Sequence, residues 1–278
     1  MQLQTYYLAC ALLSLLILYG ISLMSKVETA VKGNYLNSIA VTLAIIITII
    51  YFDIFPQKSV LYVILVCMAI GVIIGLYLTK KVEMIQMPQL VALLNGIGGA
   101  ASLIVGGCTI FVASSKFESI TSIIALIIGT ITLTGSLIAA AKLSNRISVK
   151  PIIWKFHQTI IVISIIILLI IITSFIIINN LPILLLAVIT FILSGLLGIA
   201  IVIRVGGADM PITISLLNSF SGVAGSICGM AIGDILLVSV GGIVGASGLI
   251  LTQIMCKSMN SSILKIFQGK TTTKNSVE

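Results

Sequence analysis

The sequence is short of charge. Only 8% of its 278 residues are Asp, Glu, Lys or Arg, whereas 59% are hydrophobic and the mean hydropathy is +1.31. Soluble domains carry about 25% charged residues, so this chain has too few to cover a surface that faces water. The lipid bilayer must therefore be its main solvent. The net charge of +8 lies in short segments between apolar runs, which argues against nucleic acid as a partner.

The apolar runs also lack the alternation of a membrane β-barrel, whose strands switch between apolar and polar residues with period two. Residues 160–178 instead form one long apolar run. About 20 such residues are needed for a helix to cross a bilayer, and a helix satisfies its own backbone groups in hydrocarbon. The expected fold class is therefore an all-α integral membrane protein, a bundle of about nine transmembrane helices.

No basic residue precedes the first apolar run, which is the reverse of a cleavable signal peptide. That run is therefore expected to be a true first helix with its N-terminus outside. The nine predicted helices cover residues 3–24, 38–52, 60–79, 90–113, 120–141, 159–178, 181–203, 211–231 and 235–255.

The basic residues check this count, because Lys and Arg collect in cytoplasmic loops. With nine helices, only Lys58 and Lys116 of the fifteen Lys and Arg fall outside. The other thirteen are Lys26, Lys32, Lys80, Lys81, Lys142, Arg146, Lys150, Lys155, Arg204, Lys257, Lys265, Lys270 and Lys274. Adding or losing one helix would scramble this segregation, so a cytosolic C-terminus is expected.

Neither cysteine nor histidine is arranged for a metal. The five cysteines show no metal-binding or disulfide spacing. His157, the single histidine, lies in a basic loop near the inner surface; a solvated or interfacial position is expected, with a proton-relay role left open. Residues 96–101, GIGGAA, match a dinucleotide fingerprint, but they lie inside an apolar run and not between a strand and a helix. Close helix packing is expected there instead.

Small and polar residues recur at helical spacing in the predicted helices at 90–113, 120–141, 211–231 and 235–255. Small residues let helices approach closely in lipid, and this accounts for most of the glycines. Asn95 and Asn218 differ, because an amide inside a membrane needs hydrogen-bond partners and often marks a transport path. Together with Ser136 and Ser219, they can hold a file of water by donating and accepting hydrogen bonds. None of the four titrates near neutrality, and no Asp, Glu, His, Lys or Arg lies in the middle of a predicted helix.

The segment RVGGADMP, residues 204–211, places Arg204 and Asp209 on either side of a glycine pair, with a proline positioned to begin a helix. A surface ion pair at a helix start is the simplest interpretation. A loop of this kind could also be where a cytosolic domain senses the state of the membrane helices.

Several long motifs in order resemble the membrane domain of the beta subunit of proton-translocating NAD(P) transhydrogenase. They are MSKVETAVKGN, KKVEMIQMPQLVALLNG, TLTGSLIAAAKLSNRISVKP, IRVGGADMPITISLLNSFSG and VGASGLILTQIMCKSMN. The resemblance implies a Re/Si-specific complex that couples proton entry to hydride transfer from NADH to NADP⁺. Partner soluble domains would bind NAD and NADP, and this chain would bind no cofactor or metal and hold no hydride-transfer site.

The resemblance also implies roles for individual residues. Asn95, Ser136 and Asn218 match functional positions of the proton path, while Asp209 and Lys257 match positions facing the NADP(H)-binding domain. Arg204 is expected to orient Asp209. Some members of the family have a histidine where Asn95 stands, and others place a histidine on a helix of the alpha partner. An alpha-type partner is therefore expected to supply the titrating group near Asn95.

The resemblance further implies a transmembrane proton-translocation domain at residues 1–256 and a short cytosolic tail at 257–278. That tail is too short for a nucleotide-binding domain, since domains usually have 50 residues or more, so that domain is either a separate chain or lost from this one by truncation. The expected partners are alpha-type subunits, a separate NADP-binding domain and the lipid bilayer, in a dimer of the whole complex in the bacterial inner membrane. A stand-alone ion or small-molecule transporter is the alternative, although no inverted repeats are evident; a purely structural anchor would not need the polar stripes.

Overall fold

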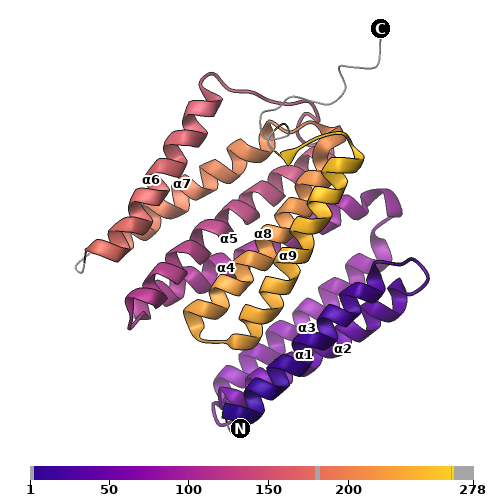
Figure 1. The fold of residues 1–278 in the computed structure, drawn as a ribbon, viewed down its shortest axis with the longest axis vertical. Helices are drawn as coiled ribbons and strands as arrows, with labels where there is room; N and C mark the ends of the chain where they lie inside the picture. The colour runs from indigo at the N-terminus through magenta and orange to yellow at the C-terminus, as the bar shows by residue number, and fades with distance from the viewer. Residues whose placement is uncertain (1–2, 179–181, 264, 266–278) are drawn as a thin grey trace. The chain divides into compact units, whose positions relative to one another are not determined.

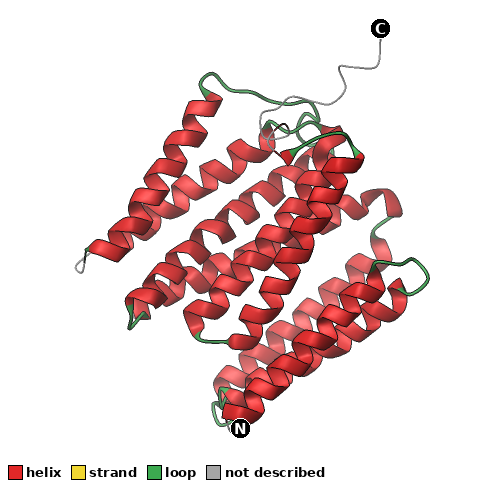
Figure 2. Cartoon of the chain, viewed as in Figure 1, coloured by secondary structure: helices red, strands yellow, loops and turns green. Residues whose placement is uncertain are grey.

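The computed structural model describes residues 3–178, 182–263 and 265. Over these residues the chain forms nine α-helices and two short 3-10 helices, with no strand among them (Figures 1 and 2). The elements are α1 (Leu3–Met24), α2 (Ala30–Tyr51), α3 (Lys58–Lys81), η1 (Met84–Gln86), α4 (Met87–Val112), α5 (Lys116–Leu143), α6 (His157–Ile177), α7 (Ile183–Ile203), η2 (Gly207–Asp209), α8 (Met210–Ile232) and α9 (Ile235–Ser258). All nine α-helices are long and apolar enough to cross a membrane, which confirms the expected class.

The helix bounds differ most from the prediction at α2, which begins at Ala30 and not at residue 38. The prediction began where the apolar run begins, but the preceding polar residues contain no proline and continue the helix. Gly33 in this added part is buried, and a Cβ there would lie only 2.6 Å from the Gly20 carbonyl oxygen of α1. Close packing on α1 therefore extends the helix beyond its apolar run.

Two predictions fall wholly or partly on residues that the structure does not describe. The predicted start of the seventh helix at Leu181 lies outside the described residues, and α7 is described from Ile183. Most of the predicted tail at 257–278 also lies outside them. Where the tail is described, α9 continues to Ser258.

The described chain packs as two compact units, Met1–Met84 and Ile85–Glu278. In the first unit α1 and α2 run antiparallel, with Gly20 against Asn37 and Gly33 against Met24. Near the opposite ends of these helices, the rings of Tyr6 and Tyr51 stack with centroids 3.6 Å apart. No residue of α3 is buried, as suits a helix whose sides contact lipid or another chain.

The second unit is built on two antiparallel helix pairs in close contact, α4 with α5 and α8 with α9 (Figure 1). A Cβ at Gly99 of α4 would lie 2.7 Å from the Gly129 carbonyl oxygen of α5. A Cβ at Gly222 of α8 would lie 2.5 Å from the Gly245 nitrogen of α9. Both pairs therefore touch backbone to backbone, which confirms close packing as the role of many of the glycines.

Contacts between these pairs show that α8 runs parallel to α4 and α7 parallel to α5. Asn95 contacts Ile214, and further along both helices the Cys228 thiol lies 3.5 Å from the Ser102 carbonyl oxygen. Gly195 likewise contacts Thr130, and Gly135 contacts Val202. Every connection from α4 to α9 therefore reverses the chain direction, as expected when each helix crosses a bilayer.

This alternation gathers seven described basic residues at one end of the second unit, where α5, α7 and α9 finish. We call it the basic end. Its described basic residues are Lys142, Arg146, Lys150, Lys155, Arg204, Lys257 and Lys265, whereas Lys116 lies at the opposite end. α6 is the most apolar of the helices and packs mainly on α7 through residues such as Leu168 and Phe175. Its remaining surface is exposed and apolar, so it suits contact with lipid.

Candidate functional site

The two membrane amides lie at the contact between α4 and α8. Asn95 is buried on α4, and its Nδ2 donates to the Ile214 carbonyl oxygen of α8 at 3.2 Å. Asn218 is half-buried one turn after Ile214. Residues four apart share one face of a helix, so Asn218 lies on the face of α8 that Asn95 contacts.

Ser136 lies beside this contact, on α5. Its side chain is fully buried, and its Oγ has no hydrogen-bond partner among the described residues. A Cβ at Gly96, the residue after Asn95, would lie 3.2 Å from the Ser136 Cβ. The structure therefore places Ser136 next to Gly96, the neighbour of Asn95, and the start of the turn from Ile214 to Asn218 against Asn95 itself. We call Asn95, Ser136 and Asn218 the polar cluster.

Ser219 lies elsewhere, although it follows Asn218 in the sequence. Its Oγ donates to the Gly245 carbonyl oxygen of α9 at 2.6 Å, and Gly248 of α9 packs on its backbone. The structure therefore places Ser219 at the contact of α8 with α9. Consecutive residues of a helix are rotated by about 100° around its axis. Asn218 and Ser219, which the sequence grouped together, therefore face different neighbouring helices.

The polar cluster contains amides and a hydroxyl but no group that titrates near neutrality. α4 and α8 hold no Asp, Glu, Lys, Arg or His at all, and those of α5 lie in its first or last turn. The described residues also contain no group of three His, Cys, Asp or Glu suited to a metal ion. The cluster can hold water by hydrogen bonds, but a proton acceptor would have to come from another part of the protein.

His157 is buried at the first residue of α6, so the expected solvated position was wrong, whereas an interfacial depth stays a prediction. The Trp154 N–H donates to its Nδ1 at 3.3 Å, and its Nε2 lies 2.8 Å from the Ala200 carbonyl oxygen of α7. With Nδ1 as the acceptor, Nε2 is the ring nitrogen that donates to the Ala200 carbonyl. His157 thereby joins the first residue of α6 to a carbonyl in the last turn of α7, where carbonyl groups lack intrahelical donors.

The RVGGADMP segment forms the turn between α7 and α8 at the basic end. Arg204 is 6% exposed, and its NH1 donates to Gln158 Oε1 of α6 at 3.1 Å. Burial lowers the pKa of the Arg204 guanidinium, because low dielectric disfavours the charged form. The contact with Gln158 means that this guanidinium also holds the start of α6 against α7.

Asp209 is 3% exposed and lies in η2, directly before α8. Its carboxylate is close enough to the Cys256 thiol of α9 for an electrostatic interaction. Lys257, the next residue, is exposed. The structure therefore brings Asp209 and Lys257 to one region of the basic end, Asp209 beneath the surface and Lys257 on it.

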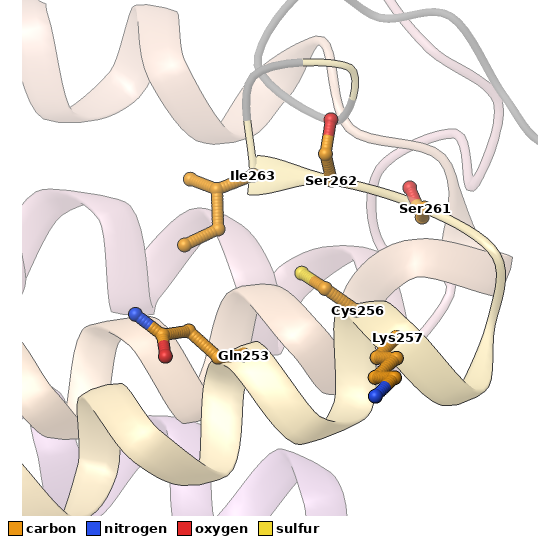
Figure 3. A pocket seen from close by; sticks show the side chains of 6 residues that line it. All are labelled: Gln253, Cys256, Lys257, Ser261, Ser262 and Ile263. Atoms are coloured by element: carbon orange, nitrogen blue, oxygen red, sulfur yellow. The ribbon is translucent and has the colours of Figure 1, made fainter.

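A wide, shallow pocket of about 420 Å³ lies beside this region, at the end of α9. Its lining residues are Gln253, Cys256, Lys257, Ser261, Ser262 and Ile263 (Figure 3). The side chains of Gln253, Cys256 and Ile263 converge in Figure 3, while the Lys257 amine extends away from Ile263. Because Cys256 also interacts with Asp209, the pocket is connected to the turn that precedes α8.

Lys142 is a residue of this site that its sequence pattern did not single out. It ends α5 after three alanines and counts in the sequence only as one more basic charge. In the structure its side chain is fully buried and donates to backbone carbonyls of two loops. A lysine next to small residues at a helix end is the only signal that the sequence offers.

The chain was compared with known proteins. A sequence model of the family described as NAD(P) transhydrogenase beta subunit matches residues 4–278. Two relatives are named NAD(P) transhydrogenase subunit beta, one from Rhodospirillum rubrum and one from a named strain of that species. Each is 35% identical over 277 residues, covering 95% of this chain and 57% of the relative. The chain thus spans just over half the length of the curated relatives that it matches.

These matches run through every helix that carries the polar cluster and through the turn that carries Asp209. They confirm the resemblance that the sequence motifs indicated and do not favour a stand-alone transporter. With nine apolar helices in its described part, the chain is a multi-pass membrane protein, and it belongs to the NAD(P) transhydrogenase beta subunit family.

Proposed function

We propose that this chain is the membrane part of a proton-translocating, Re/Si-specific NAD(P) transhydrogenase. In this proposal proton movement through the chain drives hydride transfer from NADH to NADP⁺ on partner soluble domains. Those domains bind NAD and NADP, and this chain holds neither cofactor. The observation that supports the proposal best is the polar cluster, because a buried amide, a half-buried amide and a buried hydroxyl without a partner among the described residues rarely lie inside a membrane without a role.

The polar cluster suits a water-filled path better than a fixed proton site. Asn95 keeps one amide hydrogen on the Ile214 carbonyl and still has an acceptor oxygen, while the Ser136 hydroxyl has no protein partner among the described residues. Such groups can orient water molecules by both donating and accepting. Because none of them changes charge, an alpha-type subunit is proposed to supply the titrating group, a histidine packed near Asn95.

The inner surface is proposed to meet a separate NADP-binding domain through Lys257 and the turn that holds Asp209. Lys257 is exposed there and can be contacted directly. Asp209 lies beneath the surface, so its charge would act on the partner through the turn and the end of α9. The assembly is proposed to be a dimer of the whole complex in the bacterial inner membrane.

Replacement of Asn95 by leucine tests the proton path. Asn95→Leu removes the hydrogen bond to the Ile214 carbonyl and fills the polar cluster with an apolar side chain. We therefore expect gradient-driven NADP⁺ reduction in proteoliposomes to fall at least about tenfold, because a positioned polar group contributes at least that much to proton transfer. Asn34→Leu is the matched control, because Asn34 is exposed on α2, and it should leave the rate unchanged.

Assembly with the partners should be the same for both variants. Rapid, gated proton uptake by this chain without an alpha-type partner, unaffected by Asn95→Leu, would place the proton site elsewhere and reject the assignment.

A further inference from the structure

Lys142 is a fully buried ammonium group at the end of α5. Its Nζ donates to three backbone carbonyl oxygens: Ile203 at 2.5 Å, Val205 at 2.7 Å and Lys150 at 3.3 Å. An ammonium has three hydrogens and no acceptor, so its whole donor capacity is used. These bonds join α5 to two loops that are far apart in the sequence.

The carbonyls that Lys142 contacts belong to the end of α7 and to the loop before α6. Carbonyls at a helix C-terminus lack intrahelical donors and carry partial negative charge, so a cation is stabilised there. The same two loops also bond to each other directly. The Ile152 N–H donates to the Ile203 carbonyl at 3.2 Å, and the Gly207 N–H donates to the Val149 carbonyl at 3.0 Å.

The position of Lys142 between two functional regions is unusual. Ser136 of the polar cluster lies six residues earlier on the same helix, and Asp209 lies four residues after Val205. Charge-assisted hydrogen bonds are about twice as strong as neutral ones. Removing the ammonium would take one donor from each of three carbonyls, of which the Ile203 carbonyl keeps the Ile152 N–H. A shift of α5 along its axis would therefore carry the turn at 203–209 with it.

We infer that Lys142 is a positioning residue that fastens the 203–209 turn to α5 and transmits movement between the polar cluster and the Asp209 region. The functional half of this inference rests on the proposed function, whereas the structural half does not. A lysine that only completed the fold would support the amount and stability of the protein but would not change how hydride transfer responds to a proton gradient.

Hydrogen–deuterium exchange of the full chain in lipid nanodiscs tests the structural half. In Lys142→Met the amide groups of residues 149, 150, 152 and 203–209 should exchange at least about tenfold faster, because the side chain that holds both loops is lost. Exchange in the contact between α8 and α9 should not change. Arg146→Met is the matched control, since Arg146 lies in the same loop, carries the same charge and is exposed; it should stay within about twofold of wild type.

The functional half is tested in the reconstituted complex by one ratio, the hydride-transfer rate under an imposed proton gradient divided by the rate after an uncoupler collapses that gradient. Lys142→Met should bring this ratio close to one, whereas Arg146→Met should keep the wild-type ratio. If Lys142→Met does not assemble, Lys142→Gln keeps an N–H donor on a neutral side chain that is one atom shorter, and its ratio should still lie below half that of wild type.

Wild-type exchange at 203–209 in an assembled Lys142 variant would overturn the fastening role. Faster exchange with a wild-type ratio, or both rates falling in proportion to the amount of complex, would overturn transmission and leave a purely structural lysine. A wild-type complex without any response to the gradient would reject the proposed function, and the exchange experiment would still decide whether Lys142 holds the turn.

Discussion

At the scale of single residues, Asp209 shows how the chain combines burial with charge. Its carboxylate lies under the surface at the start of α8, near the thiol of Cys256. The described hydrogen bond of the Arg204 guanidinium goes to Gln158 and so toward α6. The expectation that Arg204 orients Asp209 stays a prediction. If Arg204 has that role, it would have it in addition to its hydrogen bond with Gln158 of α6.

Asp209→Asn should lower coupled activity, because it removes a charge where α7, α8 and α9 meet while keeping the size of the side chain. We expect at least about a tenfold loss of gradient-driven NADP⁺ reduction, equivalent to about 1.4 kcal/mol, with normal insertion into the membrane. Asp53→Asn is the matched control, because Asp53 is exposed in the turn after α2. Wild-type coupled activity of Asp209→Asn in the reconstituted complex would reject a role at the interface with the NADP-binding domain.

The sequence singled out the polar residues inside the membrane helices more readily than it located their partners. An amide inside an apolar run must find a partner, so Asn95 and Asn218 stood out by composition alone. The partner of Asn95 is a backbone carbonyl 119 residues away, which depends on the register of α4 against α8. Lys142 and His157 were treated as surface groups because short basic loops usually face water, but the carbonyls at the end of α7 hold both of them inside.

At the scale of elements, the tight turn between α8 and α9 depends on two residues. Gly233 ends α8 with φ +72°, a left-handed conformation that costs glycine little. Asp234 then caps α9, with its Oδ1 accepting from the Leu236 and Leu237 N–H groups at 2.9 and 3.2 Å. This pair explains how helices so close in the sequence lie antiparallel.

Asp234→Ala should therefore destabilise the protein by about 1 kcal/mol, the usual cost of losing an N-cap side chain. The loss can be measured as a shift in unfolding of the detergent-solubilised chain. Asp234→Asn keeps the accepting oxygen and should lose less than half as much. Equal stability of the alanine variant and wild type would show that the cap contributes nothing.

Two glycines of α8 differ in the space around them, so alanine substitutions at the two positions should have different effects on stability. A Cβ at Gly222 would lie 2.5 Å from the Gly245 nitrogen, whereas a Cβ at Gly225 would meet nothing within 4 Å. Gly222→Ala should therefore cost at least about 2 kcal/mol, because overpacking a close contact forces the backbone to move. Gly225→Ala should be neutral or slightly stabilising, since alanine favours a helix over glycine by about 1 kcal/mol.

Unfolding of both variants in the same detergent provides the comparison. Equal stability of Gly222→Ala and Gly225→Ala would contradict the backbone contact between α8 and α9.

Helix existence was predictable from the sequence, and helix ends were less so. A long apolar run predicts each membrane helix, because in hydrocarbon the backbone must satisfy its own hydrogen bonds, as a helix does. The ends lie where polar residues resume, and polar residues such as those at 30–37 extend a helix when a neighbour packs on them. That information depends on α1 and is absent from the α2 segment itself.

At the scale of the whole molecule, the number of crossings has two independent supports. The sequence segregates thirteen Lys and Arg from two others when nine helices are assumed. The structure adds that α4 and α5, α6 and α7, and α8 and α9 are antiparallel neighbours, whereas α5 runs parallel to α7 and α4 to α8. Together these directions require a reversal at each connection from α4 to α9. The side of the membrane on which each terminus lies stays a prediction from charge.

Reporter fusions after Gly33, Gln57, Lys116 and Lys257 test that orientation. We expect cytosolic signals after Gly33 and Lys257 and external signals after Gln57 and Lys116, because the basic loops should stay inside. A cytosolic signal at Gln57 or Lys116 would reject the nine-helix orientation, and the packing of α4 to α9 would not change that conclusion.

The backbone contact between Gly222 and Gly245 also limits how this protein can be repaired after mutation. In an ordinary core, a residue that becomes too large can be accommodated when its neighbour becomes smaller. Here the neighbour is backbone, and no substitution makes a backbone smaller. A genetic selection for second-site suppressors of Gly222→Ala should therefore yield revertants at position 222 or changes that let α9 shift as a whole, and no compensating change at Gly245 itself.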